Sequence, residues 1–513
     1  RMSDGRSVVR VLQDIEQLAR ERRELEAQVA SLIKTKLARD ESPQPEVEHE
    51  RVKIPYSMLH FVVSEYVFLR NRELAEERKS GGLMRQVLED HHPSLDISKE
   101  RLARSPFPLR PVERETLVSL YEPLPKKNVY SGEAARAEVR KHMKDFDRID
   151  LIRGLPKTAI KPLLGGDAVS TLKGPAHSSA PVQRFGGHAC CRTVSTYPWK
   201  PGYPMREGDP ICDRYFVKLY ENRVIAALAD GCNWGNSARS AAKKAAKAFV
   251  TFMAQRQRKD GLLTPDAVAK SMLCAFRDAH HRIVQSAPGE ALWEAGTTTM
   301  AGSMIVELTN GQWLFMCCNL GDCKALLYSK EYGSLADLTK GTRCAPMNSR
   351  DPGGRLGPYQ GDGRADLRNL SVFSSPCELG DIVILVSDGV YDCLDPRHQG
   401  KSPRDCGIDE DDWGMVPNEV ANRINDDLVE KLMLSVVKEH AGDRAIGVED
   451  FCTALTSYSY QLTATTRDFM VTRPNERLPK DYNRFPGKVD HTSVVAIEVG
   501  KVTLSYQQWM GRN

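Results

Sequence analysis

The stretch RVIAALADGCNWG, residues 223–235, runs from an apolar segment into an Asp-Gly turn, and DIVILVSDGVYD, residues 381–392, repeats this arrangement. Short apolar runs that end at turn residues predict buried strands. Three more aspartates lie at the ends of apolar runs: Asp213 before RYFVKL, Asp322 after WLFMCCNLG, and Asp490 at the start of the run TSVVAIEV. Acidic residues therefore mark five expected strand ends.

These acids need a compensating charge, because an ionised carboxylate beside a buried strand is costly when nothing pairs with it. A turn preference explains any single Asp-Gly pair. It does not explain five acids that each adjoin an apolar strand. The expected partner is a metal, and all-oxygen ligation favours Mg²⁺ or Mn²⁺ over Zn²⁺, which prefers Cys and His.

The surrounding pattern predicts the fold. Two helices are expected to begin at Ser237 and at Thr264-Pro265, and two more to cover 417–440 and 448–466, so that each helix pair lies between groups of strands. This order predicts an α+β fold, a four-layer αββα sandwich of two mainly antiparallel sheets flanked by helix pairs. The expected strands are 214–219, 223–229, 300–307, 313–320, 323–328, 370–374, 381–386 and 492–499.

Six segments, read in order, resemble the signature of the metal-dependent, PPM-type Ser/Thr protein phosphatases of the 2C class. One of these matches alone is weak, whereas six in the same order are specific. The segments are PICDRYFV (210–217), ADGCNWG (229–235), AGTTTMAGSMI (295–305), NLGDCKALL (319–327), VSDGVYDCLD (386–395) and DHTSVVAIEV (490–499).

The resemblance implies a role for each acid. Asp230 would bridge two Mg²⁺ or Mn²⁺ ions, and the Gly231 carbonyl would help to hold the second ion. Asp388 and Asp490 would complete the ligands of the first ion, and Asp213 would bind metal-coordinated water. Asp230, Asp388 and Asp490 would hold the nucleophilic water through the metal.

The resemblance also implies a third, weaker metal site at Asp322 and Asp392, together with Asp388, and a structural role for Thr297–Thr299. The implied activity is hydrolysis of phosphomonoesters on phosphorylated proteins. It would proceed by direct attack of a hydroxide that bridges the two ions, without a covalent phosphoenzyme.

Three departures from the family pattern concern the same site. Cys212 stands where the family usually has an acid, and Cys232 occupies the position of a His that many eukaryotic members use as a proposed general acid. The phosphate-binding Arg of the family normally lies about five residues before the equivalent of Asp213. Here Arg206 lies seven before it, so it is either the phosphate-binding residue or a plain surface Arg.

Three functions remain open: an active protein phosphatase, a phosphatase-like scaffold or adaptor that acts through N-terminal helices, and a nucleotide or small-phosphate hydrolase. Against the third, the chain has no phosphate loop of the Walker type.

The basic segment 472–488 is interpreted either as a recruiter of phosphorylated protein or as a solvated loop. Its basic residues are Arg473, Arg477, Lys480, Arg484 and Lys488.

The chain is expected to divide into a coiled-coil-like helix (1–50), a helical and linker region (51–183), the phosphatase domain (184–500) and a C-terminal tail (501–513). Apolar residues at heptad spacing in 8–36 predict a coiled-coil partner or self-association, the alternative being an amphipathic helix folded onto its own domain. Further helices are expected at 56–78 and 131–152.

Composition excludes other classes. The 513 residues are 41% apolar and 27% charged with a net charge of +4, too small a bias to indicate nucleic acid. No stretch approaches the roughly 18 uninterrupted apolar residues of a membrane span. Thirteen cysteines without a CxxC pair indicate a reducing compartment, so an intracellular location, cytoplasmic or nuclear, and a signalling role are expected.

Overall fold

The computed structural model describes residues 143–175, 182–200, 202–203, 205–287, 292–342, 351–359, 363–500 and 502. The coiled coil expected in 8–36, the helix expected at 56–78, the beginning of the helix expected at 131–152 and the tail from 503 onward lie outside these residues.

Two six-stranded sheets form the centre of the fold, and every strand pair in them is antiparallel. The first sheet has the order β1 (Ser170–Gly174), β4 (Arg214–Tyr220), β5 (Arg223–Ala229), β6 (Met300–Glu307), β7 (Trp313–Leu320) and β10 (Ser371–Cys377). The second has the order β2 (Gln183–Phe185), β3 (Ala189–Ser195), β12 (His491–Glu498), β11 (Ile382–Val386), β8 (Lys324–Ser329) and β9 (Ser334–Asp337).

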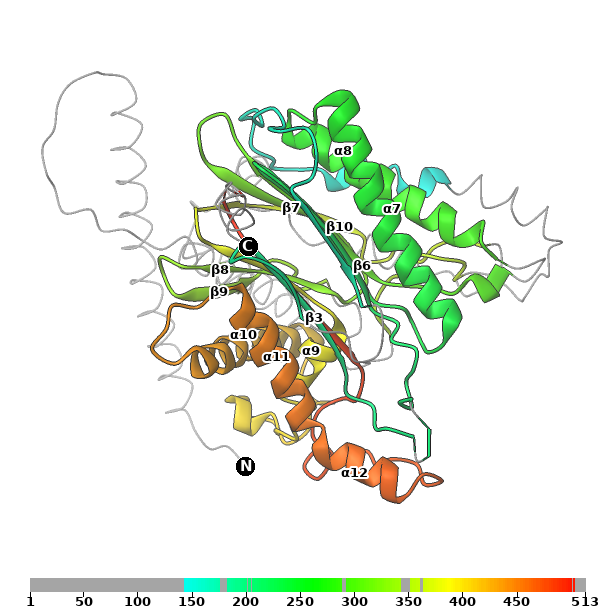
Figure 1. Cartoon of the computed structure of the whole chain (residues 1–513). Coiled ribbons are helices and arrows are strands. Elements are labelled where there is room, and N and C mark those ends of the chain that lie inside the picture. The colour runs from blue at the N-terminus through cyan, green and yellow to red at the C-terminus, as the bar shows by residue number, and fades with distance from the viewer. Residues whose placement is uncertain are drawn as a thin grey trace, which may run out of the picture. The chain divides into compact units, whose positions relative to one another are not determined.

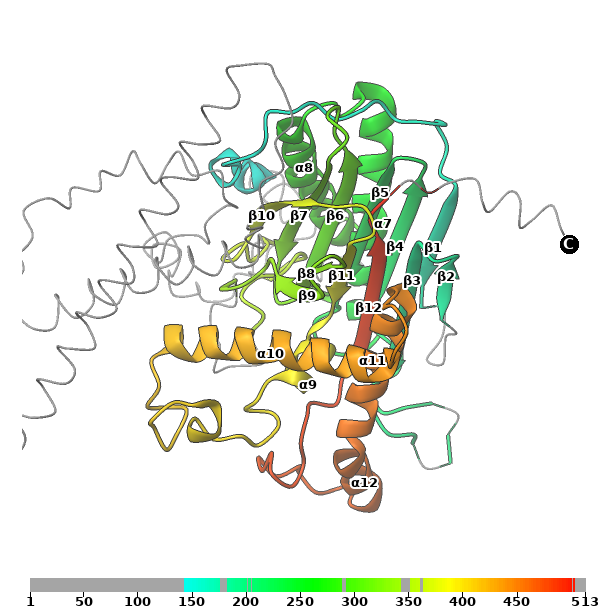
Figure 2. The same cartoon turned by 90° about the vertical axis from the view of Figure 1, so that its left-hand side faces the viewer.

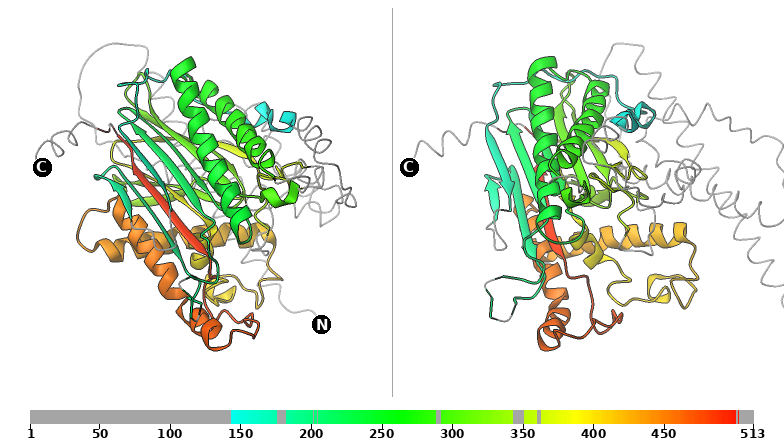
Figure 3. Two further views of the ribbon diagram at one scale, coloured as in Figure 1. Left: turned by 45° about the vertical axis from the view of Figure 1, so that its right-hand side comes forward. Right: turned by 90° about the vertical axis from the view of Figure 1, so that its right-hand side faces the viewer.

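Helices cover the outer face of each sheet (Figure 1). On the first sheet lie α7 (Asn236–Asp260) and α8 (Pro265–Val284), and Figure 3 shows α7 running along the strands. On the second lie α9 (Asp388–Leu394), α10 (Asn418–Ala441) and α11 (Val448–Leu462), followed by α12 (Ala464–Thr472) (Figure 2). The predicted αββα sandwich and its eight predicted strands are confirmed.

The apolar runs are continuous because both faces of the central strands are buried. In β5, Val224 and Leu228 point into the core between the sheets, whereas Ile225 and Ala227 point toward α7 and α8. A strand alternates its faces with a period of two, so a strand between two cores has no polar positions. For this reason the runs that precede the acids contain no alternating pattern.

Small residues let α7 pack closely on the first sheet. Its buried face includes Ala241, Ala242, Ala245 and Phe249, spaced as one side of a helix. The Phe249 ring lies against Gly302 of β6, where an added Cβ would approach the ring to 2.6 Å. The next helix, α8, begins as predicted, because the Thr264 hydroxyl accepts a hydrogen bond from the Ala267 amide at 3.2 Å.

The domain boundary expected near residue 184 is too late. Strand β1 pairs with β4 along its whole length, from Ser170 opposite Leu219 to Gly174 opposite Tyr215. Ile160 is buried and bridges to Leu308. The Pro, Ser, Gly and Lys content of 154–187 predicted a linker, but edge strands need few apolar residues because only one of their sides is paired.

The strands β2, β3 and β9 were not predicted either. At the expected helix 131–152, the described part forms two short 3-10 helices, Met143–Phe146 and Ile149–Leu151.

None of the helices in the described ranges is both long and apolar enough to cross a membrane.

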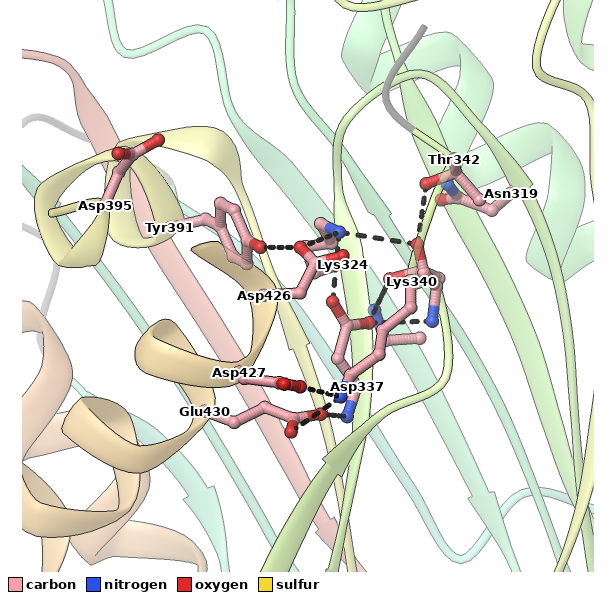
Figure 4. Close-up of polar contacts among 12 residues, drawn as sticks. Asn319, Lys324, Asp337, Lys340, Thr342, Tyr391, Asp395, Asp426, Asp427 and Glu430 are labelled. Carbon is pink, nitrogen blue, oxygen red and sulfur yellow. Dashed lines mark hydrogen bonds and ion pairs between the residues drawn. The ribbon is translucent and has the colours of Figure 1, made fainter. Parts of the chain in front are cut away.

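A buried polar network joins the second sheet to its helices (Figure 4). The Lys324 ammonium of β8 lies 3.0 Å from the Asp337 carboxylate and 3.7 Å from that of Asp426 on α10. The Tyr391 hydroxyl of α9 donates a hydrogen bond to Asp426, and Lys324 also lies over the Tyr391 ring at 4.5 Å. The network therefore fixes α9, the short helix that carries Asp388 and Asp392.

Replacing Lys324 with Met should destabilise the fold by about 3–5 kcal/mol, because Asp337 and Asp426 would remain buried without their cation. The midpoint of urea denaturation measures this change. Lys330→Met is the matched control, since Lys330 follows the same strand but is exposed. Equal midpoints for the two variants would contradict the assigned role of the network.

Candidate metal centre

The sandwich brings the predicted acids to one end of the two sheets, in two pairs. In the first sheet, Arg214 pairs with Ala229, so Asp213 and Asp230 extend from adjacent strand ends. In the second, the end of β11 meets the start of β12, where Val386 pairs with Val494. Asp388 and Asp490 extend from these two ends.

The two acidic pairs lie close enough for their charges to interact. The pKa of Asp230 is raised well above the ordinary value, first by burial and then by the negative charges of Asp213, Asp388 and Asp490. Within the described residues, the Asp230 carboxylate forms no hydrogen bond or ion pair. Asp230 is half-buried, and a carboxylate in this state needs a cation or a proton.

Asp213 is in the same situation. Its side chain is fully buried, and neither carboxylate oxygen has a hydrogen-bond partner in the described part of the chain. Burial raises the pKa of Asp213 to about 7, and the charges of Asp490 and Asp388 contribute to this rise. The hydroxyls of Ser493 and Ser387 lower the pKa of Asp213 and offset only part of this rise. In the part of the chain that the structure describes, no ion pair neutralises Asp213 or Asp230.

The Asp388–Asp490 pair has a partner. The Lys488 ammonium lies 2.5 Å from Asp388, 2.9 Å from Asp490 and 3.1 Å from Asp392, one helical turn further along α9. The other oxygen of Asp388, Oδ1, is buried without a hydrogen-bond partner. Burial raises the pKa of Asp490 to about 6, although Lys488 opposes this change.

Lys488 is the residue that sequence reasoning missed, because it was assigned to a basic surface segment. The sequence could have indicated this role, because Lys488 lies two residues before Asp490, the acid at the start of a strand that needed a counter-charge. Of the other basic residues in that segment, Arg473 pairs with Glu476 at 3.3 Å and Arg484 lies over the Phe485 ring.

Gly231 and the threonines behind it hold the Asp230 main chain in place. Gly231 bridges to Thr298, and an added Cβ at Gly231 would lie 2.5 Å from the Ala238 carbonyl oxygen. The Asp230 carbonyl accepts hydrogen bonds from the Thr298 hydroxyl at 2.6 Å and from the Thr299 amide at 2.9 Å. The threonine segment thus fixes the main chain of Asp230 through hydrogen bonds to its carbonyl oxygen.

Asp322 and Asp392 lie at the margins of this centre. Both are buried, and Asp392 joins it through Lys488. The charges of Asp322 and Asp388 contribute to a raised pKa at Cys232, although burial is the main cause and brings that pKa to about 11. Asp322 therefore lies on the Cys232 side, with Gly321 in the left-handed region at φ 101° where the chain turns.

Cys212 is a buried thiol with no sign of a ligand role. Its Sγ donates to the carbonyls of Pro210 and Gly235 at 3.3 and 3.7 Å, and burial raises its pKa to about 12. Its amide donates to Nδ1 of His491 at 3.3 Å. Cys212 therefore joins the loop before β4 to the start of β12.

Arg206 makes no ion pair with these acids in the described residues. Its Nη1 donates to the Tyr197 carbonyl at 2.6 Å, and its guanidinium lies 4.4 Å from the Trp199 ring centroid and 5.8 Å from that of Tyr460. Its role in phosphate binding remains a prediction.

Arg355 is a basic side chain on the Asp230 side that the sequence did not single out. The next residue, Leu356, pairs with Thr298 through two hydrogen bonds of 2.8 and 3.0 Å. The Arg355 guanidinium lies 4.6 Å from the Tyr359 ring, its Nε is buried without a partner, and its charge acts on Cys232.

The donor set fits a hard cation at Asp213 and Asp230, where the candidate ligands are oxygen atoms and no ion pair forms within the described ranges. As the side chains stand, no three His, Cys, Asp or Glu residues among those described are arranged to hold a metal ion. Lys488 accounts for part of this result, because its ammonium lies among Asp388, Asp392 and Asp490.

Comparison with known proteins finds a relative that matches part of this chain. The PP2C-like domain-containing protein CG9801 of Drosophila melanogaster is 34% identical over 196 residues. Over these residues the chain is similar to a PP2C-like protein, and we call its sandwich the PP2C-like domain. The match covers 37% of the chain and only 26% of the fly protein, so it does not extend to that protein as a whole.

No family model matches the chain. Among solved structures, the serine/threonine phosphatase PstP of Mycobacterium tuberculosis has a TM-score of 0.32 and 13% identity, over 61% of this chain and 99% of that one. The photosystem II phosphatase PBCP has a TM-score of 0.35 and 14% identity, over 61% and 99%.

The buried acids predict a pH dependence of the metal-free PP2C-like domain. Since the pKa of Asp213 rises from 3.8 to about 7 on folding, the folded state holds a proton that the unfolded chain has already lost. The free energy of unfolding should therefore fall as the pH rises from about 4 to about 7, by about 1–3 kcal/mol.

Asp213→Asn should flatten this slope, measured as urea midpoints in EDTA across the same pH range. Asp443→Asn is the control, because Asp443 is exposed. A slope that is the same in both variants would show that Asp213 ionises normally.

Proposed function

We propose that the PP2C-like domain is a metal-dependent protein Ser/Thr phosphatase. One observation carries the proposal: acids from four strand ends of two sheets gather at one place, and those of the first sheet form no ion pair among the residues that the structure describes. Such an arrangement opposes folding unless a bound cation compensates for it. A site of this kind is retained for its ligand rather than for stability.

Different residues of the chain would hold different metal ions. Asp230, Asp213 and the Gly231 carbonyl would hold one Mg²⁺ or Mn²⁺, and Asp230, Asp388 and Asp490 the other. Asp322 and Asp392, with Asp388, would form a third, weaker site. Ions bound there would make water nucleophilic and neutralise charge on the phosphoryl oxygens.

Orientation of the site comes from groups behind these ligands. Thr298 and Thr299 hold the Asp230 main chain through its carbonyl. Asp490 is held by the Thr196 hydroxyl, which accepts from the Asp490 amide at 2.6 Å, and its Oδ1 accepts from the His491 amide at 2.8 Å. Such supporting contacts fix ligand positions.

The scaffold interpretation is the second candidate, and Lys488 is the observation that favours it. A protein cation already contacts Asp388 and Asp490, while Cys212 and Cys232 replace an acid and a His of the family pattern. In that case the fold would bind partners without turnover, through the helices expected in 8–36. The coiled coil, the intracellular location and the signalling role remain predictions.

Asp230→Asn separates these candidates. With Mn²⁺ we expect the unaltered chain to hydrolyse a Ser/Thr phosphopeptide and p-nitrophenyl phosphate, and with EDTA to hydrolyse neither. Because loss of even supporting groups around metal ligands costs 10–100-fold, the variant should lose about 100-fold or more. Asp443→Asn is the control, and ATP is the substrate that tests the nucleotide alternative.

Turnover that persists in EDTA would contradict the proposed chemistry. Absence of turnover in every condition, from a chain that still binds Mn²⁺ in calorimetry, would favour the scaffold.

Arg355 should contribute to phosphate binding in this phosphatase, since its charge acts at Cys232, next to the Asp230-Gly231 turn. We expect Arg355→Met to raise KM for the phosphopeptide about tenfold with a smaller effect on kcat, because a charge-assisted contact to phosphate would be lost. Arg206→Met is the comparison, because Arg206 is the residue that the sequence favours. A larger KM effect for Arg206 would reverse the assignment.

A further inference from the structure

The Lys488 ammonium donates hydrogen bonds to Asp388 and Asp392 and forms an ion pair with Asp490. It has three N–H donors, and three carboxylates lie around it, those of Asp388, Asp392 and Asp490, all within 3.1 Å. Its side chain is only 26% exposed. A lysine at the edge of a protein surface would instead keep part of its ammonium hydrated.

The main chain around Lys488 is held on α9 and on the turn that follows it. The Gly487 amide donates to the His398 carbonyl at 2.6 Å, and Cys393 donates through Sγ to the Lys488 carbonyl at 3.5 Å. One ring nitrogen of His398, Nδ1, lies 2.9 Å from the Asp392 carbonyl. These contacts place the side chain on the same helix that supplies two of its three acids.

A second anchor lies three residues earlier. Phe485 is buried and its ring packs against Phe469 of α12 at 5.1 Å. In Figure 2 the segment between α12 and β12 passes beside α9 before it enters the sheet. The position of the ammonium is therefore set from both sides of Lys488.

An ammonium on these oxygens competes with a divalent ion for the same negative charge. Lys488 contacts Oδ2 of Asp388 and Oδ2 of Asp490, the carboxylates that would hold one metal ion of the centre. Two cations that share these oxygens would also repel each other strongly in a poorly hydrated site. Asp213 and Asp230 carry no such competitor in the described residues.

We propose that Lys488 is a built-in counter-cation that occupies the Asp388–Asp490 side of the centre and competes with a divalent ion for it. Metal binding on this side then requires Lys488 to withdraw, whereas the Asp213–Asp230 side stays available. This inference rests on the proposed metal centre and adds a control element to it.

The test is the affinity of the full chain for Mn²⁺, measured by titration calorimetry, together with the rise in melting temperature that Mn²⁺ produces. Lys488→Ser should tighten Mn²⁺ binding by about tenfold or more, since it frees three carboxylates from one ammonium. In EDTA the same variant should melt at a lower temperature than the unaltered chain, and Mn²⁺ should stabilise it more.

Two further variants identify the cause. Lys480→Ser removes the same charge from the same segment, but at an exposed side chain, and should leave Mn²⁺ affinity unchanged. Lys488→Arg keeps the charge and should keep the weak affinity. Equal Mn²⁺ affinities for Lys488→Ser and the unaltered chain would overturn the proposal.

A folding defect would also be informative. If Lys488→Ser is unfolded in EDTA but folds when Mn²⁺ is added, the metal has replaced the ammonium, as proposed. If it stays unfolded in both conditions, Lys488 has a role that a metal cannot replace, and the proposal fails. Because these measurements need no turnover, an inactive enzyme leaves them valid, and their failure leaves the phosphatase assay untouched.

Discussion

The fold depends on how it compensates negative charge at one end of the sandwich. Five aspartates lie next to strand ends there and a sixth, Asp392, lies within α9, so buried strands or α9 fix each main-chain position. Burial is the main reason why the pKa values of Asp213, Asp230 and Asp490 are raised, and repulsion among the neighbouring carboxylates adds to it. Every functional interpretation follows from which cation relieves that repulsion.

The two sheets differ in how the negative charge of their aspartates is compensated. The second sheet uses Lys488, an ion-pair partner from the segment that leads into β12. The first sheet has no equivalent, because the Arg214 guanidinium that follows Asp213 donates to the main-chain carbonyl of Asp213 rather than to its carboxylate. Among the described residues, Lys488 therefore gives the acids of the second sheet an ion pair that those of the first sheet do not have.

The central strands and main helices could be predicted because they carry strong local signals: apolar runs bounded by turns, and a Thr-Pro cap at 264–265. The acids could be predicted because each adjoins such a run. The edge strands β1 and β2 could not, since an edge strand is held by its neighbour and tolerates polar residues such as Lys173 and Arg184. Lys488 could not be placed because contacts with α9, about a hundred residues earlier in the chain, direct its side chain inward.

The location of the counter-charge outside both sheets also has an evolutionary consequence. Residue 488 lies in a connecting segment, so its identity can change without disturbing any strand, whereas each aspartate is tied to the end of a packed strand or to α9. A lineage could therefore gain or lose dependence on a divalent ion through substitution at a single loop position, with the whole scaffold retained. Catalytic and non-catalytic descendants of one ancestor could then share the same strands and the same aspartates and differ at residue 488.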